Sequence, residues 1–111
     1  MTVSTAQPLA TGQGLDGADP AAPWQDLAAQ FRAVADPTRL RLLASLRSHP
    51  GQQACVKELT QATGLAQPLV SHHLQILRRA LLVHSTRHGS HVYYRLDASA
   101  VNATAQALTQ A

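Results

Sequence analysis

The feature that most constrains this chain is a pair of helical patterns separated by a single glycine, Gly64. The first pattern predicts a short helix over about residues 56–63, which ends at Gly64 because glycine readily adopts the left-handed conformation that closes helices. The second predicts a helix over roughly residues 66–80, with Pro68 in its first turn, where proline is tolerated. Two helices joined by a tight turn are typical of a helix-turn-helix.

The second of these helices has two unlike faces. At about 100° per residue, Val70, Leu74 and Leu77 gather on one side. The opposite arc is mostly polar and basic, and we expect it to bind DNA: Gln67, Pro68, Ser71, His72, Gln75, Arg78 and Arg79. The major groove admits such a helix, whose polar side chains read base edges while its arginines contact phosphate or guanine. The alternative is an ordinary amphipathic helix with a solvated face.

The adjacent histidines of this helix, His72 and His73, are predicted to differ in role. Neighbours on a helix point about 100° apart, so the pair is not interpreted as a metal site. His72 falls at the edge of the polar face, where it can meet DNA. His73 borders Leu69, Leu77 and Ala80, so we expect it to pack or hydrogen-bond within the protein.

The rest of the folded part is predicted from the same kinds of pattern. Residues 1–23 are rich in Gly, Pro, Ala, Thr and Gln and predict a flexible arm, so the domain is expected to span residues 24–108. A first helix begins near Trp24, and Asp36 caps a second that starts at Pro37. His49 to Gln53 is predicted as a loop. The second helix turns three leucines inward: Leu42, Leu43 and Leu46.

After the helix-turn-helix the sequence changes to a β pattern. Residues 83–96 are rich in β-branched and aromatic residues, and the turn chemistry at Gly89-Ser90 predicts a hairpin. Its basic side chains suit a wing that lies against the DNA backbone: Arg87, His88 and Arg95. A last short helix is expected over residues 99–108.

Composition supports an anionic partner and excludes other classes. The 111 residues carry 9 Lys and Arg against 6 Asp and Glu, with an isoelectric point near 9.8. A mildly basic small domain favours nucleic acid.

Cys55 is the single cysteine, so the fold has no internal disulfide, and no apolar run of about 18 residues or secretory signal is visible. We therefore expect a cytoplasmic protein that is no membrane protein. No nucleophile–base set, glycine-rich phosphate loop or HExxH motif supports an enzyme.

Three stretches, "FRAVADPTRLRLLASL", "CVKELTQATGLAQPLVSHHLQILRRALLV" and "HGSHVYYRL", resemble the ArsR/SmtB family of repressors. The resemblance implies a mainly α fold with a β-hairpin wing (α+β), a homodimeric winged helix-turn-helix. It implies a repressor released from a palindromic operator by an inducer, often a metal or metalloid ion. The first and last helices would pair the protomers through apolar stripes: Trp24, Leu27, Phe31, Val101, Ala105 and Leu108.

The inducer sites of that family are not all matched in this chain. Asp97 stands where zinc-sensing members have their first ligand, but Ser99 and Gln110 replace the histidines, so that zinc site is expected to be absent. Members that bind soft metalloids carry Cys-Val-Cys where this chain has Cys55 followed by Val56 and Lys57. One thiol is too few for a metalloid.

Weak metal candidates remain, together with an alternative that needs no metal. Cys55 is one candidate, and His88 and His91 are another, because they would be cross-strand neighbours about 5 Å apart on the hairpin. Phosphate contact or a solvated wing is the simpler interpretation of these histidines. The alternative is a regulator of the same fold that responds to thiol chemistry at Cys55 or to pH through its histidines.

Overall fold

The order of the helices and of the hairpin follows from local sequence signals. The computed structural model describes residues 22–111, so the expected arm lies almost wholly outside the described residues. The helices are α1 (Ala22–Val34), α2 (Pro37–Ser48), α3 (Val56–Thr63), α4 (Gln67–Arg79) and α5 (Ala98–Thr109). The strands are β1 (Gln53–Cys55), β2 (Val83–His88) and β3 (His91–Leu96). This confirms a mainly helical winged helix-turn-helix with an antiparallel sheet.

The predicted start of α2 and the predicted end of α3 are confirmed, and the ends of α1 and α5 differ by one or two residues. The Asp36 carboxylate accepts a hydrogen bond from the backbone N–H of Arg39 at 3.0 Å, and this bond lowers the pKa of the Asp36 carboxyl. Gly64 ends α3 at φ 73°, a left-handed conformation that a side chain would strain. α1 begins at Ala22, two residues before the expected Trp24, and α5 is one residue longer at each end than predicted.

The loop predicted for His49 to Gln53 is wrong. Residues Pro50–Gln52 form a 3₁₀ turn, and Gln53 begins strand β1, which pairs antiparallel with β3 in the sheet order β1-β3-β2. A strand of three residues is too short to show an alternating pattern. Its pairing instead depends on β3, about 40 residues away in the sequence, opposite Tyr93, Tyr94 and Arg95.

The hairpin has the predicted register. His88 pairs with His91 across the Gly89-Ser90 turn, and Gly89 has φ 62°. At the other end of β2, the chain leaves α4 through Leu81, which also has a positive φ of 63° although it is not a glycine. Its side chain is exposed.

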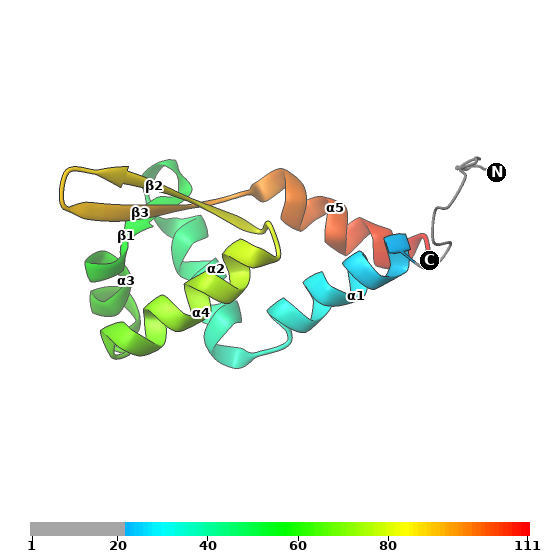
Figure 1. Ribbon diagram of the computed structural model, residues 1–111, viewed down its shortest axis with the longest axis horizontal. Helices are drawn as coiled ribbons and strands as arrows, with labels where there is room; N and C mark the ends of the chain where they lie inside the picture. Colours follow the sequence, from blue (N-terminus) through cyan, green and yellow to red (C-terminus); the bar gives the residue numbers. More distant parts are fainter. Residues whose placement is uncertain (1–21) are drawn as a thin grey trace.

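One apolar core holds α2, α3, α4 and the sheet together. It includes the three leucines predicted to point inward from α2 and the apolar face of α4, with Leu59, Leu82 and Leu96. α1 and α5 lie side by side at the opposite end of the molecule (Figure 1), where Thr104 donates a hydrogen bond to Gln30 at 2.8 Å. The helix-turn-helix and wing thus form one end, and the two terminal helices form the other.

Shortening a core side chain of α4 should destabilise the protein far more than shortening an exposed one on the same helix. Leu74 has no exposed area, so Leu74→Ala is expected to lower the free energy of unfolding by about 2–5 kcal/mol. Leu69 is 40% exposed, and Leu69→Ala should change it by less than about 0.5 kcal/mol. Urea unfolding at equal protein concentration measures both. Equal losses would contradict the described orientation of α4.

Candidate nucleic-acid interface

The polar face of α4 points to solvent, as its periodicity predicts. Val70, Leu74 and Leu77 are completely buried. Ser71 is half-buried, and the other residues predicted to contact DNA on this helix are exposed: Gln67, Pro68, His72, Gln75, Arg78 and Arg79. The structure therefore brings these side chains together on one open surface. Their contact with DNA stays a prediction.

Two residues of this face are held by neighbours that the sequence does not reveal. The side-chain amide of Gln75 donates to the Tyr94 hydroxyl of β3 at 3.3 Å and accepts from Arg78 at 3.3 Å. Tyr94 is only 4% exposed. Gln75 is thus oriented by the sheet and in turn orients Arg78. No sequence signal pairs Gln75 with Tyr94, because the contact depends on how α4 packs against β3.

An open hollow of 380 Å³ lies between α4, the start of α3 and the wing. Gln67, Ser71 and Gln75 line it from α4, Lys57 from α3 and His91 from the wing. Polar and basic groups from three elements therefore surround one depression beside the polar face of α4.

The side chains predicted to lie on the wing surface are exposed. They are Arg87, His88 and Arg95, predicted to contact DNA, and His91, predicted as a weak metal candidate. The ring of His88 lies edge-on to Tyr93, with centroids 5.5 Å apart. Within residues 22–111, no arginine or lysine forms an ion pair with a carboxylate. These positive charges are therefore free to meet an anionic partner.

The two adjacent histidines of α4 differ as predicted. His72 is exposed, whereas the side chain of His73 is 12% exposed and its Nδ1 lies 3.0 Å from a guanidinium nitrogen of Arg39. Their rings meet edge to face at 5.2 Å. His73 thus bonds within the protein.

Asp97 binds two partners, neither of them predicted. Its Oδ1 accepts from the backbone N–H of Ala100 at 2.9 Å and caps α5, and its Oδ2 lies 2.7 Å from Nε2 of His84 in β2. The hydrogen bond with His84, followed by that from Ala100, lowers the pKa of the Asp97 carboxyl. One carboxylate therefore joins the wing to the last helix.

Cys55 is buried at the start of α3, beside a carboxylate. Its side chain is buried and it stands at the N-cap of α3. Its backbone N–H donates to the Glu58 carboxylate at 2.9 Å, and hydrogen bonds from Cys55 lower the pKa of Glu58. The buried thiol therefore shares the start of α3 with the Glu58 carboxylate, whereas the Lys57 side chain is exposed.

The residues predicted to form a dimer interface remain uncovered in the single chain. Trp24 and Leu108 are 59% and 62% exposed, Ala105 is exposed, and Leu27, Phe31 and Val101 are half-buried. A mainly apolar groove of 680 Å³ runs between α1 and α5 beside Leu27, Ala103 and Ala107.

Within residues 22–111, every helix is too short or too polar to span a bilayer.

The comparisons with known proteins agree with one another. Residues 36–85 match the family model for bacterial regulatory proteins of the arsR family. The transcriptional repressor SmtB homolog of Synechocystis sp. is 44% identical over 72 residues, covering 65% of this chain and 52% of that protein. The HTH-type transcriptional regulator YgaV of Escherichia coli is 37% identical over 79 residues, covering 71% of this chain and 78% of that protein.

A solved structure agrees with these sequence matches. It is the homodimeric winged helix-turn-helix DNA-binding domain of a possible ArsR-family regulator from Mycobacterium bovis. It has a TM-score of 0.69 and 26% identity, covering 86% of this chain and 88% of that one. The chain spans about half the length of the SmtB-type relatives it matches.

The Asp97 contacts should make stability depend on pH in the acid range. Because the folded-state pKa of Asp97 is lowered, its contribution is present above its ordinary value of about 3.9 and is lost as the pH falls through the folded-state value. Asp97→Asn should therefore be less stable than the parent at pH 7, and the difference should shrink towards pH 2. Asp26→Asn, which alters an exposed carboxyl of α1, serves as the control. Thermal unfolding at each pH measures both; a deficit for Asp97→Asn that does not change with pH would refute this role.

Proposed function

The chain belongs to the ArsR family of bacterial regulatory proteins, and on that premise we propose that it is a homodimeric repressor that binds operator DNA and is released by an inducer. The observation that carries the proposal is the orientation of α4. Val70, Leu74 and Leu77 are completely buried, so seven positions from Gln67 to Arg79, all polar or basic except Pro68, share one surface that a major groove can receive.

The wing and the unpaired cations support the same proposal. Arg87 and Arg95 extend the positive surface beyond α4, with the exposed His88 beside them, and neither arginine forms an ion pair with a carboxylate within the described chain. Phosphate contacts of this kind supply affinity and register, while base contacts supply specificity.

Homodimerisation through α1 and α5 completes the proposal. Trp24 lines the groove between these helices, Ala105 and Leu108 are exposed on α5, and a second copy of the chain would cover them. A two-fold dimer presents two α4 helices to successive major grooves, so the operator is expected to be palindromic. Sedimentation analysis tests the mass directly, and a monomer at micromolar concentration would contradict this step.

Affinity for DNA should fall steeply with salt if the cations meet phosphate. A duplex selected from a random pool with the wild-type protein provides the probe. Each phosphate contact contributes a slope of about −0.9 in log affinity against log salt. An affinity that does not change with salt concentration would refute DNA binding through this surface.

Individual substitutions should separate positioning contacts from base contacts. Arg79→Ala is expected to weaken binding to all sequences and to reduce the salt slope by about one. Gln67→Ala and Ser71→Ala should instead relax the preference for particular bases, by about 1–3 kcal/mol each. Arg47→Ala removes the same charge from the exposed end of α2 and is the matched control. Selection from a random pool with each variant provides the measurement; a uniform loss from all of them would contradict this division.

A metal inducer requires more donors than one described chain brings together. Within residues 22–111, no three His, Cys, Asp or Glu side chains form a group. His84 pairs with Asp97 and His88 with His91, whereas zinc and soft metalloids take three or four ligands. Within residues 22–111 of one chain, therefore, no complete metal site is assembled, and a metal inducer would need ligands from both protomers, whereas the metal-independent form of the proposal needs none. The bond between His84 and Asp97 joins the wing to α5 and lowers the pKa of the Asp97 carboxyl, so protonation of that carboxyl at low pH would break the link and carry a pH signal between the two elements.

A panel of inducers tests this form of the proposal. Zinc, cadmium, arsenite and an oxidant should leave DNA binding unchanged, whereas lowering the pH should change it and His84→Gln should reduce that change. Binding is measured by fluorescence anisotropy with the selected duplex, on the parent and on Cys55→Ser. Release by arsenite or oxidant in the parent but not in Cys55→Ser would instead establish Cys55 as the sensor.

A further inference from the structure

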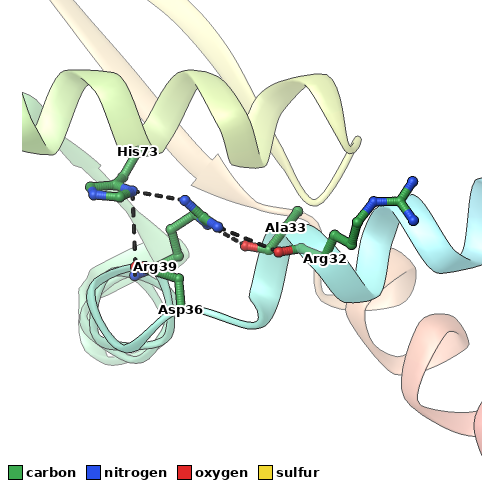
Figure 2. Close-up of polar contacts among 5 residues, drawn as sticks. All are labelled: Arg32, Ala33, Asp36, Arg39 and His73. Carbon is green, nitrogen blue, oxygen red and sulfur yellow. Dashed lines mark hydrogen bonds and ion pairs between the residues drawn. The ribbon is translucent and has the colours of Figure 1, made fainter.

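Arg39 lies where three helices meet. It belongs to the first turn of α2, and its guanidinium donates to the carbonyl oxygens of Ala33 and Arg32 at the end of α1 and to Nδ1 of His73 in the middle of α4 (Figure 2). The bonds to Arg32 and His73 measure 3.4 and 3.0 Å. One planar group therefore joins α1, α2 and α4.

The contact with α1 gives the Ala33 carbonyl a donor and gives the Arg32 carbonyl a second one, beside the backbone N–H of Ala35 at 3.3 Å. The last carbonyls of a helix have no N–H within the helix to bond, and they carry its negative dipole end. A guanidinium supplies several donors in a fixed plane as well as the matching charge. Lysine would supply a single rotating ammonium, which does not reproduce this geometry.

The contact with α4 determines which nitrogen of His73 carries a proton. Arginine only donates, so Nδ1 must accept, and the proton of the neutral ring is on Nε2. Asp36 is the other charged group near Nδ1, but its carboxylate oxygen is 4.0 Å away, which is too far for a hydrogen bond. His72 meets the His73 ring from the same helix. Figure 2 shows His73 directed at both Arg39 and Asp36.

Apolar packing between α1 and α4 is thin beside this contact. An open hollow of 310 Å³ lies there, lined by the small side chains of Ala29, Ala33 and Ala80 together with Ile76 and the arginines around them. Farther along, the amide of Gln30 donates to the carbonyl of Ala80 at 3.2 Å, at the end of α4. A single contact would allow α4 to pivot. Two contacts, at its end and at its middle, fix its direction relative to α1.

We propose that Arg39 and His73 are positioning residues, whose hydrogen bond fixes the angle between α1 and α4 and so sets the separation of the two recognition helices in the dimer. This inference goes beyond the proposed function and rests on it for one point, that α1 pairs the protomers. The proposed ligand is still operator DNA. The bond determines whether the two α4 helices of a dimer reach their half-sites at the same time.

The first test measures the angle without DNA. Nitroxide labels at Gln25→Cys on α1 and Gln67→Cys on α4, in a Cys55→Ser background, report the distance within one chain by pulsed electron resonance. Labelled chains are diluted with unlabelled protein, so the measurement holds for a monomer or a dimer. The parent should give a narrow distribution, and His73→Leu and Arg39→Lys a broader or displaced one. His73→Asn should restore the narrow distribution, because its Oδ1 accepts near the position of Nδ1.

The second test compares a palindromic duplex with a single half-site. His73→Leu should bind the palindrome about tenfold more weakly than the parent, the effect of losing one hydrogen bond to a charged group, and the half-site equally well. His73→Asn should recover the palindrome. A purely structural role would lower affinity for both duplexes alike, with a matching loss of thermal stability.

The outcomes separate this inference from the proposed function. If the wild-type protein binds no DNA, the proposed function fails, and the label distances still decide whether the bond positions α4. Unchanged distances in His73→Leu, or a proton on Nδ1 of the neutral ring in ¹⁵N spectra, would overturn the inference. Equal losses on palindrome and half-site would overturn its role in spacing.

Discussion

The burial of one face of α4 is the constraint on which the rest of the structure depends. Val70, Leu74 and Leu77 have no exposed area, and they contact the core from a helix that carries arginines and histidines on its other side. Rotating α4 by one residue would expose this apolar surface and bury charged groups, at a cost of several kcal/mol. The hydrophobic effect therefore chooses which side chains reach solvent. Hydrogen bonds to Tyr94 and Arg39 then set orientation more finely than apolar packing can.

Local signals were sufficient for most of the fold. The cap at Asp36, the stop at Gly64 and the turn at Gly89-Ser90 each involve residues within a few positions of one another, and each is confirmed. Strand β1 was missed because its pairing is decided by β3. The apolar stripe of α5 did not predict which of its residues pack within the chain. Val101, Thr104 and Ala107 do so, and Thr104 is among them because its hydroxyl bonds to Gln30.

The candidate site was predicted as a surface but not as a network. Periodicity placed the residues predicted to contact DNA together and separated His72 from His73. It could not supply the partners of Gln75, His73 or Asp97, which come from elements 13 to 34 residues away. Asp97 shows the difference most clearly. The resemblance assigns this position to a metal ligand, whereas here both carboxylate oxygens are engaged, one by the start of α5 and the other by His84.

The unpaired cations have a consequence for the protein when no partner is bound. Positive side chains such as Arg78 and Arg79 are adjacent, with no carboxylate within ion-pair distance in residues 22–111. Their mutual repulsion opposes the compact state, and a polyanion that screens them removes that repulsion. Selection for a positive surface therefore acts against the stability of the free protein, as it does wherever a binding surface is optimised for its ligand. By mass action, the folded state gains stability whenever the polyanion is present.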